Sequence, residues 1–301
     1  MTAAIHEQAT TESSSDGYLV RVGETRDLDA VYAIACAKFA TADVYPQFLF
    51  GQFADILGEG FVVAEYRGEV VGYSVTMLDA AHPDHGVVLS SAVNPAHARS
   101  GVDELLHARA MRYLAERSRE VDPKKPAPPR EPYVGQTFGP YRVREFRASD
   151  LAGVYGVELS AFGDDPYPVL FFEQLATVLG GGFLVAESHS ADGPAVVGYL
   201  LAVLDARYPD LGWVMSVAVH AEHRGHHVGY HLMDAAETYF KSQRCSEVML
   251  TVDPDNVPAV TLYKNLDYRE IERNDNHHGL NLSRLVMKQH TFVDVPRLKG
   301  E

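Results

Sequence analysis

The chain has 301 residues, of which 46% are hydrophobic and 22% are charged. This balance excludes a wholly disordered or collagen-like chain, and the length suggests two domains. The chain carries 41 acidic and 26 basic residues, which gives a formal net charge of −15. That excess of negative charge disfavours nucleic acid as a partner, because nucleic acid is bound through basic surfaces.

The cysteine content and the amino-terminal segment bear on the cellular compartment. Cys36 and Cys245 are the only cysteines. A secreted disulfide scaffold would carry more, so we expect a cytoplasmic protein in which both are small buried thiols. No apolar run approaches the ~18 residues needed to span a bilayer. Residues 1–16 are polar and lack the apolar core of a signal peptide, so we expect a disordered tail there.

Much of the sequence occurs twice, in the same order and at nearly constant spacing. The matching segments are Tyr45–Phe50 with Tyr167–Phe172, Phe61–Glu65 with Phe183–Glu187, Val70–Tyr73 with Val196–Tyr199, and Leu78–Ala80 with Leu204–Ala206. Self-similarity of this extent indicates a tandem duplication.

Each copy begins with the same pattern of elements, from strand Leu19–Val22 in the first and Arg142–Glu145 in the second. Two helices follow, the second of them after a Tyr-Pro pair, and then a hairpin, a further strand and a helix. In the second copy these are the hairpin Phe183–Glu187 and Val196–Leu204, strand Trp213–Val219 and helix Val228–Phe240, continued by strand Glu247–Val252, helix Pro258–Asn265 and strands Tyr268–Glu272 and Ser283–Lys288. This order predicts an α/β (α+β) fold with a mixed, mainly antiparallel sheet flanked by helices.

The first copy ends earlier than the second. Residues 122–136 contain five prolines, which cannot supply backbone donors to a sheet or a helix interior, so we expect an extended linker. The predicted organisation is therefore a tail (1–16), a shortened lobe (17–121), the linker (122–136), a complete lobe (137–290) and a second tail (291–301).

The segment between Val217 and Gly229 joins a strand to the start of a helix. Such a junction presents unpaired backbone N–H groups and the positive end of the helix dipole to an anion. Gly225 and Gly229 would let a phosphate approach the main chain closely. The segment has neither the Gly-Lys-Ser/Thr of a Walker loop nor a Gly-x-Gly-x-x-Gly dinucleotide motif.

A second strand–helix junction lies between Leu250 and Tyr268. Asn256 lies near the start of the helix, and Tyr263 follows seven residues later. Seven residues are about two helical turns, so both side chains lie on one face of the helix.

Together, the two junctions resemble the GNAT acyltransferase superfamily, whose acyl-CoA signature is Arg/Gln-x-x-Gly-x-Gly/Ala after the fourth strand. Arg224 matches its first position and Gly229 its last, whereas His227 replaces the middle glycine. Asn256, Leu262-Tyr263 and Leu266-Asp267-Tyr268 are similar to the family's later Asn, Leu-Tyr and Leu-Gly-Phe. The resemblance covers residues 141–289 well and the first copy in part, and the second lobe is similar to ribosomal-protein N-terminal acetyltransferases.

The resemblance implies transfer of an acyl group from a pantetheine thioester to an amine. The implied donor-binding groups are the backbone near Val217 and Val219, the loop formed by Arg224, Gly225, His226, His227, Val228 and Gly229, and Asn256. The Tyr263 hydroxyl would protonate the departing thiolate. The diverging fourth and fifth strands would admit the pantetheine arm.

The general base and the acceptor are less defined. Thr251 stands where related enzymes often carry a Glu, and Ser216, Asp253, His277 or His278 could relay a proton through water. An α-amine with a pKa of about 7.7–8.0 is partly neutral at pH 7, whereas a lysine near 10.4 is not. The lack of a strong base therefore favours an α-amine or another amine of low pKa.

The implied acceptor site has two parts. Tyr167 and the acidic pair Asp164-Asp165 lie between the first two helices of the second copy, where the family receives its acceptor, and acidic groups there would suit a protonated amine. Asn276-His277-His278 resembles the substrate-lining Tyr-Tyr hairpin of N-terminal acetyltransferases. A solvated loop without a ligand is the alternative interpretation of these residues.

Five histidines lie between the predicted strand and helix of the second copy at spacings of three and four. They are His220, His223, His226, His227 and His231. Such spacing on a helix could hold zinc, but no adjacent Cys or Glu completes a ligand set, and we expect no metal.

In the first copy, Ala98 stands for Arg224 and Asp103 for Gly229. An Asp at a helix start repels a pyrophosphate and caps the N–H groups itself. We expect a lobe without catalytic activity that shelters the acceptor cleft or completes the sheet of its neighbour.

The leading hypothesis is a cytoplasmic N-acyltransferase that uses acyl-CoA, with acetyl as the default group, and acts on an amine-bearing small molecule or peptide. A first alternative is an acyl donor bound to an acyl carrier protein, because such a donor lacks the pyrophosphate that His227 would crowd. A second alternative is a non-catalytic module that senses acyl-CoA. We expect neither nucleic acid nor membrane as a partner.

Overall fold

The computed structural model describes residues 12–13, 17–79, 85–120, 135–163, 165–190 and 193–291. It divides the chain into two compact units, Met1–Asp122 and Pro123–Glu301. The expected tails and the Pro-rich part of the expected linker lie largely outside the described residues. Among the described residues, no helix is both long and apolar enough to cross a lipid bilayer.

The first unit contains one antiparallel sheet with the strand order β1-β2-β3-β4-β5. Its elements are β1 (Glu12–Ser13), β2 (Tyr18–Val22), α1 (Leu28–Lys38), α2 (Gln47–Ile56), β3 (Phe61–Tyr66), β4 (Glu69–Leu78), β5 (Gly86–Val93) and α3 (Val102–Glu120). β1 lies within the segment expected to be a tail and pairs with β2.

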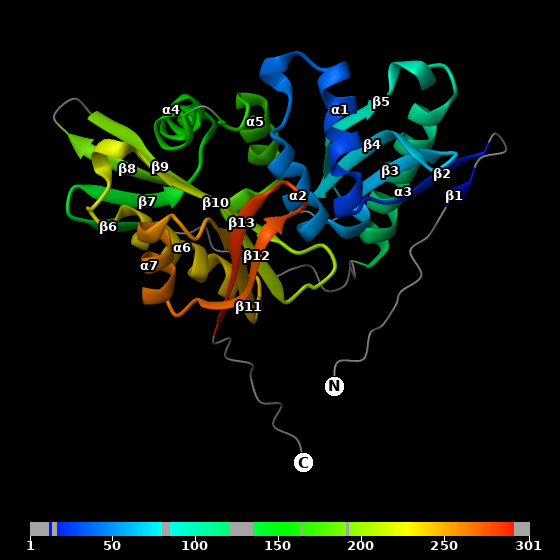
Figure 1. Ribbon diagram of the computed structural model, residues 1–301. Coiled ribbons are helices and arrows are strands. Elements are labelled where there is room, and N and C mark those ends of the chain that lie inside the picture. Colours follow the sequence, from blue (N-terminus) through cyan, green and yellow to red (C-terminus); the bar gives the residue numbers. More distant parts are fainter. Residues whose placement is uncertain are drawn as a thin grey trace. The chain divides into compact units, whose positions relative to one another are not determined.

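The second unit contains eight strands in the order β12-β13-β11-β10-β9-β8-β7-β6 (Figure 1). Its elements are β6 (Gln136–Phe138), β7 (Tyr141–Glu145), α4 (Leu151–Phe162), α5 (Val169–Val178), β8 (Phe183–Ser190), β9 (Gly193–Leu204), β10 (Leu211–Val219), α6 (Val228–Ser242), β11 (Glu247–Val252), α7 (Val257–Asn265), β12 (Arg269–His277) and β13 (Leu282–His290). Only β10 and β11 pair in parallel among these strands, which confirms the predicted mixed and mainly antiparallel sheet.

Helices cover both faces of the second sheet because its central strands are buried on both sides. Leu200 and Ala202 of β9 belong to the core built with α6. Tyr199 points to the other face, where its ring centroid lies 5.3 Å from that of Phe172 in α5 and its hydroxyl bonds to Glu158 in α4. α4 and α5 therefore cover one face and α6 the opposite face (Figure 1).

An arginine cluster joins β2 of the first unit, and β7 of the second, to the turn before the first helix of that unit. Arg144 is bonded to Asp150 at 2.6 Å and to Glu187 at 2.7 Å. The same cluster occurs in the first unit, where its members are Arg21, Asp27 and Glu65. Arginine suits this position because its planar fork can bind two carboxylates at once.

Two details differ from the sequence-based expectations. Gln136, expected at the end of the linker, begins β6 and pairs with β7. Cys36 is exposed whereas Cys245 is buried, because consecutive residues of a helix point about 100° apart and it is Ala35 that faces the core.

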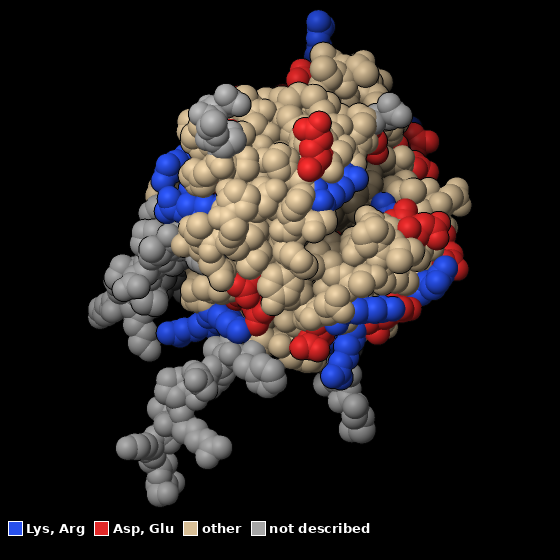
Figure 2. Space-filling model, turned by 90° about the vertical axis from the view of Figure 1, so that its left-hand side faces the viewer, with Lys and Arg blue, Asp and Glu red and all other residues tan. Residues whose placement is uncertain are grey.

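Figure 2 shows one face of the molecule with its charged side chains coloured. Most of the coloured surface on this face is uncharged, and Lys and Arg side chains are interspersed with Asp and Glu. Among the described residues drawn there, basic side chains do not merge into a continuous patch.

Candidate active site

β10 and β11 separate along their length. They pair in parallel from Leu211 and Glu247 only as far as Trp213 and Met249. β10 then continues to Val219 without a further partner on that side among the described residues. The two central strands therefore diverge, and one edge of β10 has no strand beside it beyond Trp213.

The main-chain groups of Val217 and Val219 face this open edge. The N–H of His220 donates to Val197 of β9 at 2.9 Å, and main-chain groups of alternate residues point to alternate sides of a strand. Val217 and Val219 therefore point away from β9. In agreement with this, the carbonyl of Val219 accepts a hydrogen bond from Arg224 Nε at 3.2 Å.

The loop between β10 and α6 is attached to the unit at two points. The hydroxyl of Ser160 in α4 accepts from the N–H of Ala221 at 3.0 Å. The hydroxyl of Tyr141 in β7 lies 3.2 Å from Nδ1 of His223. These contacts hold the loop at the end of the diverging strands, where the helix α6 begins.

The residues just before α6 adopt turn geometry. Gly225 has a φ of 79° and His227 a φ of 62°, both in the left-handed region. His227 is the N-cap of α6 but makes no capping hydrogen bond, and the first turn contains no acidic residue. The N–H groups at this helix start thus lack a side-chain cap, and Arg224, Gly225, His226 and His227 are exposed.

Gly229 has a packing role that the sequence did not indicate. A Cβ added at this position would lie 3.3 Å from Cδ2 of Leu262 in α7. The small residue therefore lets α6 approach α7 closely. Val228, directly before it, is buried in the core.

α7 carries the two residues singled out in the second junction. The side chain of Asn256 caps the helix by accepting from the N–H of Ala259 at 3.2 Å. Tyr263 is 6% exposed, and its hydroxyl makes no hydrogen bond with any described residue. Burial raises the pKa of Tyr263 well above its usual value. The hydroxyl thus stays protonated at neutral pH, and its proton is not donated to any of the described residues.

The loop between α4 and α5 holds the candidate acceptor residues. Tyr167 is buried, and its ring meets that of Phe171 edge-on at 5.0 Å between centroids. Asp165 is exposed, and Asp164 lies outside the described residues. The main-chain N–H of Tyr167 donates to Oε1 of Glu158 at 2.8 Å.

Glu158 is a buried carboxylate that the sequence analysis missed. It is 1% exposed. It accepts hydrogen bonds from Tyr167 and from the hydroxyl of Tyr199, which lies 3.0 Å from Oγ of Ser216 in β10. Burial raises its pKa, although these hydrogen bonds oppose the shift. One signal could have revealed it, because Glu158 is the only charged residue in the apolar helix Leu151–Phe162.

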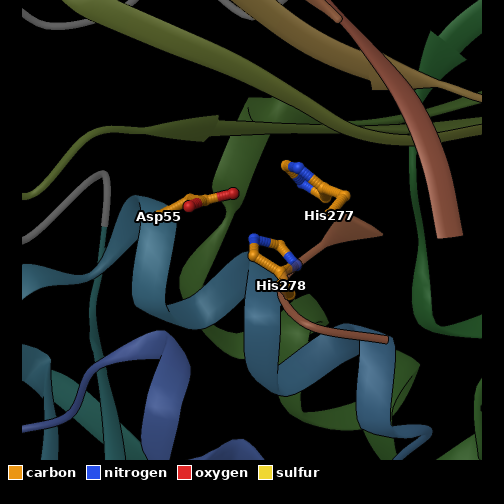
Figure 3. Close-up of side chains that lie close together, drawn as sticks. All are labelled: Asp55, His277 and His278. Atoms are coloured by element: carbon orange, nitrogen blue, oxygen red, sulfur yellow. The ribbon is translucent and has the colours of Figure 1, made fainter. Parts of the chain in front are cut away.

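His277 and His278 lie in the β12–β13 hairpin (Figure 3). Their ring centroids are 3.8 Å apart. His277 pairs with Leu282 at the end of β12, so that strand extends beyond the expected end at Glu272. Asp253, another candidate for the base, is bonded to the N–H of Asp255 and to Arg284 at an exposed position.

The first unit lacks most of these features. Its helix α3 carries Asp103 and Glu104 in the first turn. Within the residues described for this unit, no strand or helix follows α3, so Asn256 and Tyr263 have no counterpart there.

Comparisons with known proteins bear on the family of this chain. The model of the acetyltransferase (GNAT) family matches residues 28–125 and again 148–268. An N-alpha-acetyltransferase of Sulfurisphaera tokodaii is 30% identical over 142 residues, which are 44% of this chain and 82% of the relative. An uncharacterized N-acetyltransferase of Methanocaldococcus jannaschii is 34% identical over 129 residues, 42% of this chain and 78% of the relative.

Among solved structures, the ribosomal-protein-S18-alanine N-acetyltransferase of Escherichia coli is similar. It has 15% sequence identity and a TM-score of 0.44, over 53% of this chain and 99% of that one. The family model accounts for most of the chain in two separate matches. The chain therefore belongs to the GNAT acetyltransferase family and is an N-acyltransferase with two GNAT lobes.

Proposed function

We propose that this protein transfers an acetyl group from acetyl-CoA to the α-amino group of a peptide or protein, and that the second unit carries the reaction. The observation that carries the proposal is the divergence of β10 and β11 beyond Trp213 and Met249. It leaves main-chain donors and acceptors of β10 without a strand partner. An amide-rich pantetheine arm could replace that partner as a further strand would.

The charged end of the donor would lie at the start of α6. Val217 and Val219 lead directly into the loop that ends at His227, where the helix N–H groups have no side-chain cap. A helix start of this kind favours a pyrophosphate. Arg224, Gly225 and His226 are exposed beside it, and Arg224 would exchange its bond to Val219 for a phosphate contact.

Tyr263 would donate a proton to the leaving thiolate. Attack of the amine breaks the C–S bond, and the thiolate then needs a proton or a strong hydrogen bond. Within the part of the chain that the structure describes, the Tyr263 hydroxyl donates its proton to no other residue. Because burial raises its pKa, the hydroxyl serves best as a hydrogen-bond donor that releases its proton only as the thiolate develops.

The acceptor would enter beside Tyr167 and Asp165, with His277 and His278 on the hairpin side. An exposed carboxylate such as Asp165 attracts an ammonium group. An α-amine loses its proton more readily than a lysine side chain, by ~2.5 pKa units. The curated relatives named above include an N-alpha-acetyltransferase, which supports the same choice of acceptor.

The test is a single-turnover assay with acetyl-CoA and a library of peptides, half of them blocked at the α-amine and half lacking lysine. We expect mass spectrometry to find acetylation of free α-amines in peptides without lysine, and none in blocked peptides. Rapid acetylation of lysine with untouched α-amines would contradict the proposal. The same assay with acetyl groups on an acyl carrier protein tests the alternative donor. Binding of acetyl-CoA without turnover on any acceptor would instead indicate a sensing module.

A further inference from the structure

A chain of hydrogen bonds crosses one face of the second sheet and ends at Glu158. Ser216 of β10 and Tyr199 of β9 lie 3.0 Å apart, and Tyr199 donates to Oε2 of Glu158 in α4. The other carboxylate oxygen accepts from the main-chain N–H of Tyr167 at 2.8 Å. This series of hydrogen bonds therefore joins β10, the strand proposed to hold the donor, to the α4–α5 loop, which is proposed to receive the acceptor.

The chemistry of the three side chains decides which atom donates in each hydrogen bond. An ionised carboxylate can only accept, so the single hydroxyl proton of Tyr199 points to Glu158. The hydrogen bond between Tyr199 and Ser216 then requires Ser216 to be the donor. The lone pairs of Ser216 Oγ are left to accept a further proton. These hydrogen bonds are thus arranged to receive a proton at Ser216 and to store it at Glu158.

The first unit provides an internal comparison. Tyr73 and Ser90 form the same hydroxyl pair there, 2.8 Å apart. Ala35 is the eighth residue of α1, as Glu158 is the eighth of α4, and both are buried. The tyrosine–serine pair thus belongs to the architecture of both units. The carboxylate is confined to the unit that has Asn256 and Tyr263.

A buried carboxylate is costly without a cation to balance it. Among the described residues, no lysine, arginine or histidine forms an ion pair with Glu158. Its two bonded partners are the neutral N–H of Tyr167 and the hydroxyl of Tyr199, and Asp165 adds a further negative charge nearby. A residue with a purely structural role at this position could be neutral, as Ala35 is at the equivalent position of the first unit.

We propose that Glu158, through Tyr199 and Ser216, takes up the proton that the acceptor ammonium group must lose before it attacks the thioester. This inference rests on the proposed function. The ammonium proton passes to Ser216, the serine proton to Tyr199 and the tyrosine proton to Glu158, which leaves a neutral amine. The amine then attacks: the N–C bond forms as the C–S bond breaks, Tyr263 gives its proton to the thiolate, and the second proton lost by the nitrogen restores the Tyr263 hydroxyl through solvent. Glu158 returns its proton to solvent after the products leave.

The position of Ser216 suits the entry point. The pairing of β10 with β9 is shifted by a bulge between Val214 and Ser216. Ser216 thus lies just beyond the place where β10 loses β11, and next to Val217, whose main chain faces the open edge. The relay supplies the base that neither Thr251 nor the exposed Asp253 provides.

The experiment compares the wild type with Glu158→Gln and Tyr199→Phe, with Tyr73→Phe in the first unit as the matched control. We expect Glu158→Gln and Tyr199→Phe to lower kcat for an α-amine peptide about 100-fold near pH 6. Their Kd for acetyl-CoA should stay close to wild type, and Tyr73→Phe should keep the wild-type rate. The deficit should shrink above pH 8, where the amine is already neutral. A merely structural role would lower the rate equally at every pH.

A second measurement does not depend on turnover. Infrared difference spectra at stepped pH should show a protonated carboxyl band that is absent in Glu158→Gln, titrates above the ordinary range for Glu and moves to higher pH in Tyr199→Phe. The relay is overturned if that band is absent or titrates normally, or if folded Glu158→Gln keeps the wild-type rate near pH 6. Inactivity of the wild type on every amine would overturn the proposed function instead, and a normal titration would then separately exclude a proton store at Glu158.

Discussion

Gly101 and His227 both have a positive φ at the same place in the two units. Gly101 has a φ of 77° and His227 a φ of 62°, and each stands directly before the first residue of a helix, Val102 of α3 or Val228 of α6. The glycine at the middle of the family signature thus serves the left-handed turn into the helix. In the second unit a histidine occupies this turn at a conformational cost.

We expect His227→Gly to raise the free energy of unfolding by about 0.5–1 kcal/mol, because the left-handed conformation strains a residue with a Cβ. The imidazole is exposed at the helix start, and its removal should leave acetyl-CoA binding at least as tight. Urea unfolding and titration calorimetry measure the two effects. His226→Gly is the control, since His226 has no positive φ and should gain nothing. Weaker donor binding in His227→Gly would show that the imidazole contacts the ligand.

The acidic start of α3 predicts one donor site per chain. Calorimetry should give a stoichiometry of one for acetyl-CoA, and Gly229→Asp, which places an acidic residue at the start of α6, should weaken binding at least about tenfold by repelling the pyrophosphate. Gly229→Ala tests the steric part of that effect, because a Cβ there would lie 3.3 Å from Leu262. Asp103→Asn should change nothing. A second site of similar affinity would refute this view of the first unit.

Tyr263 and Tyr268 form a matched pair for testing the leaving-group role. Their ring centroids are 5.9 Å apart and both are buried. We expect Tyr263→Phe to lower kcat by about 100-fold with little change in donor affinity. Tyr268→Phe should keep most of the activity, since the family carries Phe there. Equal losses in the two variants would argue for a packing effect rather than proton donation.

The raised pKa of Glu158 predicts how the stability of the protein depends on pH. Its pKa in the folded protein is raised above the ordinary value of 4.5, so the folded state binds the proton more tightly than the unfolded state. Its contribution to the free energy of unfolding is fully present below about pH 4.5. That contribution is lost as the pH rises through the raised pKa, by up to about 1.4 kcal/mol for each pH unit. Stability relative to Glu158→Gln should therefore fall as the pH rises from 5 to 8 in urea unfolding. A difference that does not change with pH would contradict the shift.

Several features were predictable because their signals are local. Strand Glu247–Val252 has the expected bounds, and α6 begins at the expected Val228, since alternation and helix-start chemistry depend on neighbouring residues. Asn256 proved to be a helix cap for the same reason. The order of elements and the duplicated sequence patterns were likewise available from the sequence, and they led to the GNAT family.

Other features depended on contacts between distant residues. Glu158 and Tyr199 are 41 positions apart, and Tyr199 and Ser216 are 17 apart. No pattern of neighbours shows that such side chains meet on one face of a sheet. The left-handed turn at His227 and the packing of Gly229 against Leu262 are of the same kind. The family resemblance implied that two central strands diverge, but only the structure shows that their pairing ends at Trp213 and Met249. The sequence by itself determined the elements and the family, because backbone preferences act over a few residues. Only the tertiary structure decided where a buried charge and an open strand edge lie, because both result from packing between segments that are remote along the chain.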